Sequence, residues 1–128
     1  MTPSETTEVF FTYWRHPESD CVLAIPSNEL SDAMDGNLVE LDLEQYLNQV
    51  KSPDELPPGV RGILKNADWW PLAINRDVII GDLWFDPKKQ FPDGINITTS
   101  RIQDIRSDGI YKTLHSMYFV QFKEGVKR

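Results

Sequence analysis

The second half of the chain restricts the fold most, because from Trp70 onward short apolar runs alternate with residues that favour turns. The runs are rich in β-branched and aromatic side chains, which is typical of strands rather than helices. They occupy residues 78–85, 95–100, 110–114 and 117–122. Pro92-Asp93-Gly94 and Ser107-Asp108-Gly109 lie between runs and have the composition of tight turns. The pattern predicts an antiparallel β-meander over residues 70–122.

A helical region precedes this meander. Four apolar residues, Leu43, Tyr46, Leu47 and Val50, recur at the spacing of one helical face. Asp42 precedes them and Gln45 stands three residues later, which is the arrangement of a capping box. The same apolar spacing recurs further along the chain and predicts a second short helix, so the helical region spans residues 42–67. The residues of this second repeat are Val60, Ile63, Leu64 and Ala67.

The N-terminal part predicts a β-hairpin. Two apolar runs, residues 9–14 and 21–25, flank a segment with turn chemistry at residues 16–20. The hairpin spans residues 8–26. The order of hairpin, helices and meander predicts an α+β fold, in which two short helices pack on one side of a twisted antiparallel sheet or partly open barrel. At this length a single domain over residues 1–128 is expected.

Acidic side chains concentrate in the first half of the chain. Residues 1–64 contain twelve Asp and Glu against three Lys and Arg, and residues 65–128 contain eight against ten, within a net charge of −7. A field of this sign repels phosphate backbones, so direct nucleic-acid binding is disfavoured. The same field attracts a basic protein and speeds its association, although acidity also serves solubility alone.

The sequence has no feature that indicates secretion or membrane insertion. Its one cysteine, Cys21, cannot form an internal disulfide, which favours a reducing compartment. No stretch of about 18 apolar residues occurs. The N-terminus lacks the basic and apolar regions of a signal peptide. A cytoplasmic protein of bacterial type, without membrane binding, is therefore expected.

No residue pattern indicates catalysis, a metal or a cofactor. His115-Ser116 lacks the Gly-x-Ser-x-Gly elbow that exposes a hydrolase nucleophile. Cys21 opens an apolar run, so it is predicted to be a small core residue. Two histidines and one cysteine do not have the spacing of a zinc site, and the acidic residues lack the pattern of a calcium loop. We expect a protein that is not an enzyme and has no catalytic residue, metal ligand or cofactor.

Two features indicate a protein-binding surface. Between residues 28 and 60 carboxylates alternate with apolar residues and Lys51 is the one basic residue, and an acidic rim around apolar anchors is typical of surfaces that bind basic proteins. One of Trp69 and Trp70 is expected to point outward, because adjacent strand residues face opposite sides. An ordinary solvated face and two tryptophans that fill or cover the core are the alternative. The predicted partner-binding residues are Glu29, Asp32, Asp35, Glu40, Asp42, Glu44, Asp54, Glu55, Trp69 and Trp70.

The meander contains the motif Phe91-Pro92-Asp93-Gly94-x-x-Ile97-x-Thr99-Ser100-x-Ile102, followed by Thr113…Ser116-x-Tyr118. With this motif, residues 80–122 resemble a C-terminal segment of small uncharacterised bacterial and phage proteins. The resemblance implies a β-meander and a bacterial or phage setting, and it assigns no functional residue. Lys88-Lys89 and the lack of a glycine before Ser116 depart from that pattern. In size, acidity and lack of a catalytic motif, the chain is also similar to immunity proteins of contact-dependent growth inhibition, which bind a cognate toxin domain.

These features lead to three hypotheses about function. The first is a non-catalytic, immunity-type inhibitor that neutralises a basic toxin domain, for example a nuclease, by direct binding. The second is a phage or mobile-element accessory protein that inhibits a host nucleic-acid enzyme through the same acidic surface. The third is a small-ligand or carbohydrate-binding domain around Trp69, Trp70, Trp84, His16 and His115, since polar groups that converge in a cleft mark such sites.

Overall fold

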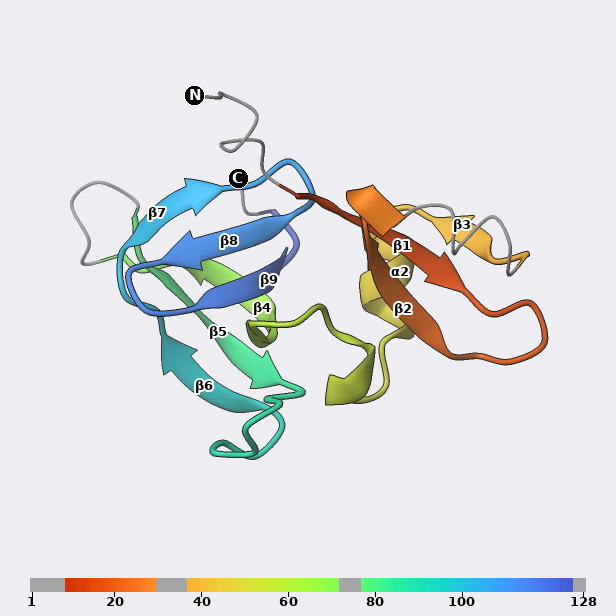
Figure 1. Ribbon diagram of the computed structural model, residues 1–128. Coiled ribbons are helices and arrows are strands. Elements are labelled where there is room, and N and C mark those ends of the chain that lie inside the picture. Colours follow the sequence, from red (N-terminus) through yellow and green to blue (C-terminus); the bar gives the residue numbers. More distant parts are fainter. Residues whose placement is uncertain (1–8, 30–36, 72–76, 126–128) are drawn as a thin grey trace, which may run out of the picture.

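The computed structural model describes residues 9–29, 37–71 and 77–125, which form two β-sheets with one α-helix packed between them (Figure 1). The three-stranded sheet has the order β2 (Val22–Pro26), β1 (Phe11–Arg15) and β3 (Val39–Leu41). The six-stranded sheet has the order β6 (Ile95–Thr98), β5 (Ile79–Trp84), β4 (Val60–Trp69), β9 (Met117–Phe122), β8 (Ile110–Thr113) and β7 (Ile102–Ile105). The other elements are the helix α2 (Leu43–Gln49) and the 3-10 turns η2 (Ser27–Glu29) and η3 (Pro53–Glu55). The predicted α+β class is confirmed.

The six-stranded sheet consists of two antiparallel arms that meet at a parallel pair. Strands β4, β5 and β6 form one arm, and β7, β8 and β9 form the other. Strand β4 pairs with β9 in parallel. The predicted meander over residues 70–122 is confirmed for the antiparallel pairs β5–β6 and β8–β9. It is wrong between β6 and β7, because a meander pairs consecutive strands whereas these two lie at opposite edges of the sheet. Residues 72–76 of the predicted meander lie outside the described residues.

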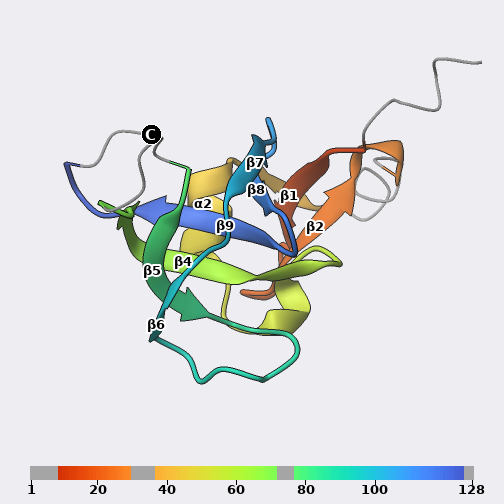
Figure 2. The ribbon, with the colours of Figure 1, turned by 90° about the vertical axis from the view of Figure 1, so that its left-hand side faces the viewer.

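The two edge strands of this sheet, β6 and β7, follow one another in sequence with only residues 99–101 between them (Figure 2). Thr99 and Ile102 donate backbone hydrogen bonds to the carbonyl oxygens of Ile79 and Asp77, at the start of β5. So short a connection between opposite edges requires the sheet to curl. Because β6 and β7 do not pair with each other, the curled sheet is not closed.

The segment predicted as a second helix is the central strand β4, so that prediction is wrong. The pairing of β4 with β9 shifts register between Val60 and Ile63 and again between Leu64 and Ala67. Such bulges change which face of a strand the following residues occupy. As a result Val60 and Ile63 pack between the two sheets, whereas Leu64 and Ala67 pack inside the curled sheet. Two bulges in a strand that is buried on both faces therefore reproduce the apolar spacing of a helix.

The first predicted helix is confirmed together with its cap. The Asp42 side chain accepts a hydrogen bond from the Gln45 N–H at 2.8 Å, and the Gln45 side chain accepts one from the Asp42 N–H at 3.0 Å. Tyr46 and Leu47 are buried, as their spacing predicts. These contacts are all within one short segment, which is why the sequence pattern is sufficient to locate this helix.

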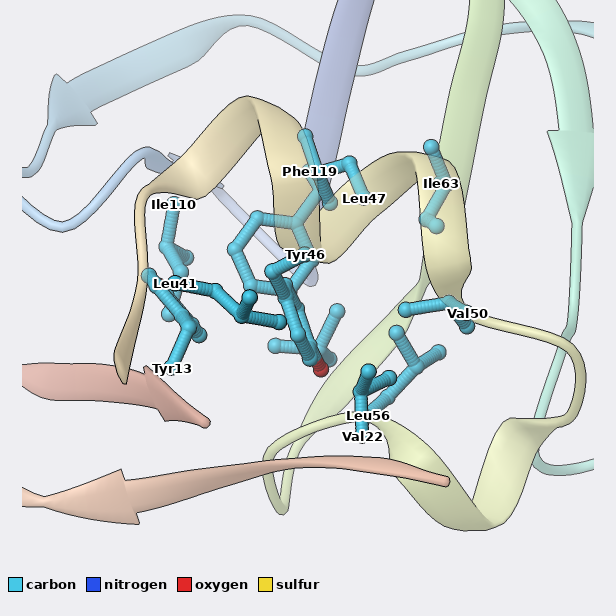
Figure 3. Packing of buried hydrophobic residues seen from close by; sticks show 11 residues of the cluster. Tyr13, Val22, Leu41, Tyr46, Leu47, Val50, Leu56, Ile63, Ile110 and Phe119 are labelled. Carbon is cyan, nitrogen blue, oxygen red and sulfur yellow. The ribbon is translucent and has the colours of Figure 1, made fainter. Parts of the chain in front are cut away.

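The core between the two sheets is centred on three aromatic rings (Figure 3). Tyr46 of α2 stacks on Tyr13 of β1 with ring centroids 4.4 Å apart, and Phe119 of β9 meets Tyr46 edge-on at 5.7 Å. Both phenols donate hydrogen bonds to carbonyl oxygens, Tyr13 to Asp108 and Tyr46 to Glu55. Burial raises the pKa of both phenols far above its ordinary value. Because the cluster contains residues from both sheets and the helix, the sheets share one core here.

A buried carboxylate forms a second link between the two sheets. Asp108, in the turn between β7 and β8, accepts a hydrogen bond from the Phe11 N–H of β1 at 3.0 Å. The same carboxylate pairs with Arg106 at 2.8 Å. Arg106 also donates a hydrogen bond to the carbonyl oxygen of Val9. A buried polar group that loses its partner costs free energy, so this network favours one position of β1 against the six-stranded sheet.

Candidate protein-binding groove

A groove lies between the start of α2 and the end of β9, two elements that are far apart in the sequence. Its volume is about 430 Å³. Apolar side chains and polar or charged side chains both line it. The lining residues are Asp42, Leu43, Glu44, Leu47, Val120, Gln121 and Phe122. We refer to it as the α2–β9 groove.

The two carboxylates of the groove, on Asp42 and Glu44, have different roles. Asp42 is the N-cap residue of α2, and its hydrogen bond to the Gln45 N–H stabilises the first turn. Glu44 is exposed, and its side chain forms no ion pair or hydrogen bond with any residue in the ranges 9–29, 37–71 and 77–125. Glu44 is therefore the groove carboxylate that is available to a ligand.

Trp69 adjoins this groove through Phe122. The ring centroids of the two residues lie 5.5 Å apart, and Trp69 packs against the core inside the curled sheet. Trp70 follows β4, and its backbone N–H donates a hydrogen bond to the Val78 carbonyl oxygen at 2.7 Å. Both tryptophans are half-buried. Trp69 packs inward on Phe122, so of the two it is not the exposed anchor.

The other exposed carboxylates of the predicted acidic tract lie on separate elements. Glu29 ends η2 and Asp54 lies within η3. Glu40 lies on β3 and is paired in register with a residue of β1. Asp32 and Asp35 lie outside the described residues. Of the ten predicted residues, the structure brings Asp42 and Glu44 together in the groove, with Trp69 beside it.

Glu55, predicted to bind a partner, instead holds η3 in place. Its carboxylate accepts hydrogen bonds from the backbone N–H groups of Val22 at 2.9 Å, Lys51 at 2.6 Å and Ser52 at 3.1 Å. These bonds join the start of β2 to the segment that follows α2. The oxygens of Glu55 are already used within the fold, so this residue is a structural carboxylate.

The β9 side of the groove was not anticipated from the sequence. The sequence pattern predicts Gln121 and Phe122 only as the end of the last strand, and it predicts Leu47 as a core residue. The Gln121 side chain donates a hydrogen bond to the Asn48 side chain of α2 at 3.1 Å, which links the two walls. No local signal places the end of β9 beside α2, because this proximity depends on the parallel pairing of β9 with β4.

The residues of the carbohydrate-binding alternative do not converge. Trp69 and Trp84 lie at opposite ends of the β4–β5 ladder, where their register partners are Ile79 and Ile63. At the rise of a β-strand the two tryptophans are roughly 18 Å apart. His16 belongs to the β1–β2 turn and His115 to the β8–β9 turn. These four residues therefore do not share a site.

Cys21 is exposed, so the prediction of a core cysteine is wrong. Strand β2 begins one residue later, at Val22, and Val22 is the residue that enters the core. The carbonyl oxygen of Cys21 accepts a hydrogen bond from the His16 N–H at 3.1 Å, which closes the hairpin turn. The cysteine thus ends a turn instead of opening a buried strand.

Among the described residues, no group of three or more His, Cys, Asp and Glu side chains could hold a metal ion. In the same part of the chain, no helix has both the length and the apolar character needed to cross a membrane. No family model, curated protein or solved structure matches the chain. The resemblance of residues 80–122 to small bacterial and phage proteins therefore stays a prediction. The same holds for the similarity of the acidic chain to immunity proteins.

Proposed function

We propose that this chain is a non-catalytic protein-binding module whose α2–β9 groove docks a basic protein. The observation that carries the proposal is the chemistry of the groove, in which Leu43, Leu47 and Phe122 lie beside the exposed carboxylate of Glu44. Lysine and arginine side chains have an apolar stem and a charged head, and such a groove is complementary to both parts.

The charge of the whole chain supports this choice of partner. The net charge is −7, and twelve of the twenty carboxylates belong to residues 1–64. Glu29, Glu40 and Asp54 are exposed and form no ion pair within the described part of the chain, so they extend the negative surface beyond the groove. A negative field of this kind attracts a basic protein over a distance and raises its association rate.

The narrower form of the proposal is an immunity-type inhibitor of a basic toxin domain, such as a nuclease. A nuclease binds phosphates through lysine and arginine side chains. The carboxylates of an inhibitor can take the place of those phosphates, and the protein then blocks the active site without any chemistry of its own. This form adds a prediction that simple binding does not make, namely that the partner loses its nuclease activity in the complex.

A titration of the full chain tests the proposal. Purified basic nuclease domains of bacterial toxins are titrated with the protein by calorimetry, and nuclease activity is measured in parallel. We expect at least one member of the panel to bind and to lose activity. The affinity should fall as salt is raised, because salt screens the attraction. Failure of every member of the panel to bind would overturn the proposal.

A pair of charge reversals locates the site. Glu44→Lys places a like charge against a basic partner, and we expect it to weaken binding about tenfold, or about 1.4 kcal/mol. Glu18→Lys is the matched control, because Glu18 is exposed in the β1–β2 turn and the change in net charge is the same. The control should alter affinity by less than about twofold. Equal losses in the two variants would mean that overall charge, and not the groove, attracts the partner.

A further inference from the structure

The loop between β5 and β6 is exposed at its tip and yet is fixed by a buried carboxylate. Asp86 accepts hydrogen bonds from the backbone N–H groups of Lys88, Gln90 and Phe91 at 3.0, 3.0 and 3.2 Å. Arg61 of β4 pairs with the same carboxylate at 3.3 Å. A loop fixed in this way loses little conformational freedom when it binds, so less of its binding energy is spent on ordering.

The backbone of this loop is strained at two residues. Phe85 has a φ of 65° and Lys89 a φ of 54°, and this left-handed conformation is unfavourable for any residue other than glycine. Asp93 holds the first of these by accepting the Phe85 N–H at 2.8 Å. Strain of this kind is retained where the surrounding structure imposes it, and it concentrates at segments that bind or react.

The tip of the loop carries two exposed cations and an exposed aromatic ring. Lys88 and Lys89 are exposed and form no ion pair within the described part of the chain. Phe91 is 40% exposed, which is high for a phenylalanine side chain, and the Arg61 guanidinium lies 5.9 Å from the centroid of its ring. We call Lys88, Lys89 and Phe91 the basic tip. An exposed apolar ring and two unpaired ammonium groups on one loop are the chemical complement of the α2–β9 groove, which has apolar side chains and the exposed carboxylate of Glu44.

We propose that the basic tip docks into the α2–β9 groove of a second copy of this chain. Phe91 contacts the apolar side chains of that groove, and the two lysines face Glu44. The argument is charge complementarity, because residues 1–64 carry most of the negative charge whereas residues 65–128 carry ten of the thirteen cations. A chain polarised in this way favours a head-to-tail contact between two different surfaces, which leaves one tip and one groove of each pair unoccupied.

The contact also regulates partner binding. This consequence, unlike the contact itself, rests on the proposed function. A basic partner and the basic tip of a neighbouring copy compete for the same groove. A contact made by one loop is small and belongs to the weak, transient class of interfaces. A tightly binding partner therefore displaces it, and self-association falls when the partner is present.

Sedimentation of the full chain tests the self-association. At about 1 mM protein and low salt, where the screening length is long, we expect an average mass above the 14.8 kDa of one chain. The average mass should rise with protein concentration and return to that of one chain at about 0.5 M salt, where exposed charges are screened. A single chain at every concentration in low salt would overturn the proposal.

Two variants identify the surfaces in contact. Lys88→Ala/Lys89→Ala removes the cations of the tip, and Glu44→Lys places a like charge in the groove. We expect each variant alone to associate about tenfold more weakly. An equimolar mixture should recover the association as a one-to-one dimer, because the intact tip of the second variant meets the intact groove of the first. Association that persists in Lys88→Ala/Lys89→Ala, or a mixture that stays monomeric, would contradict the assigned surfaces.

Further controls separate this inference from the proposed function. Arg101→Ala/Lys112→Ala makes the same change in net charge at residues that line neither the basic tip nor the α2–β9 groove, and it should associate as the unaltered chain does. Lys88→Ala/Lys89→Ala keeps its groove, so it should bind a basic nuclease domain at least as tightly as the unaltered chain. Loss of self-association without loss of partner binding thus supports the docking contact. Because self-association is measured without any partner, its outcome does not depend on the proposed function.

Discussion

At the scale of single residues, the carboxylates of this chain fall into groups that their sequence positions do not separate. Asp86 and Asp108 are buried, and each is paired with an arginine. Glu55 binds three backbone N–H groups, whereas Glu44 is exposed and unpaired among the described residues. A carboxylate in an acidic tract can therefore be a structural ligand or a binding group, and its burial and its hydrogen-bond partners distinguish the two.

The first prediction concerns the carboxylate that fixes the β5–β6 loop. Asp86→Ala leaves three backbone N–H groups and Arg61 without their acceptor, so we expect the free energy of unfolding to fall by about 3 kcal/mol. Asp93→Ala is the control, because it removes a single exposed hydrogen bond to the Phe85 N–H and should cost about 1 kcal/mol. Urea denaturation measures both. Equal effects would mean that the buried carboxylate does not organise the loop.

The lowered pKa of Asp86 makes the free energy of unfolding depend on pH. Burial acts to raise the pKa of Asp86, but hydrogen bonds from Lys88 and Gln90 and the charge of Arg61 outweigh it and hold the pKa below its ordinary value. A carboxyl with a lowered pKa in the folded protein contributes stability above its unfolded pKa, and this stability is lost as pH falls. We expect the loss to begin below about pH 4 and to be smaller in Asp86→Ala. Urea denaturation at a series of pH values measures it, and an unchanged pH profile in the variant would contradict it.

At the scale of elements, β4 shows how irregular pairing conceals a strand. Gly62 has a φ of 142°, and a Cβ at this residue would come within 2.4 Å of the Trp84 carbonyl oxygen on β5. Asn66, near the second register shift, also has a positive φ, of 53°. Glycine is unfavourable in the helix that was predicted here, but the strand requires Gly62. A side chain at this position would prevent β4 and β5 from pairing closely.

A substitution at Gly62 tests this account of β4. Gly62→Ala combines an unfavourable backbone conformation with a clash against backbone atoms, so we expect it to destabilise the protein by about 3 kcal/mol or more. Gly125→Ala is the matched control, since Gly125 also has a positive φ, of 88°, but no atom lies within 4 Å of an added Cβ. Its cost should be about 1 kcal/mol. Thermal unfolding distinguishes the two, and a tolerated Gly62→Ala would show that the bulge does not need a glycine.

At the scale of the whole molecule, the two sheets are joined by a shared core and by the Asp108 network. Tyr13 of the three-stranded sheet packs on Tyr46 of α2 and on Phe119 of the six-stranded sheet. Each sheet therefore buries its apolar face partly against the other. The six-stranded sheet has a further core inside its curl, whereas the three-stranded sheet buries its core residues in this shared cluster.

This shared core predicts cooperative unfolding of both sheets, which is the behaviour that the predicted single domain over residues 1–128 would show. Tryptophan fluorescence and far-UV circular dichroism, followed during urea denaturation, should give coincident transitions. Asp108→Ala breaks the second link, so we expect hydrogen exchange in β1 to increase more than exchange in β4. Two separate transitions in the unaltered chain would instead divide it into independent units.

The sequence by itself determined the features that depend on neighbouring residues. The helix α2 and its cap follow from the capping pair Asp42 and Gln45 and from the apolar residues of one helical face between Leu43 and Val50. All these contacts lie within about two helical turns. The strands β5, β6, β8 and β9, the turn between β7 and β8 and the asymmetry of charge could likewise be predicted from the sequence. In these segments local propensity, apolar spacing and turn chemistry favour the same structure.

Only the tertiary structure decided the features that depend on distant partners. β4 is a strand because β5 and β9 pair with it on either side, and its bulges exist only within that pairing. The α2–β9 groove and the packing of Trp69 on Phe122 follow from the parallel join of β4 and β9. The role of Glu55 follows from the position of β2 beside the segment after α2. No window of sequence contains both sides of these contacts, because the free energy that selects them comes from pairing and burial between segments far apart in the chain.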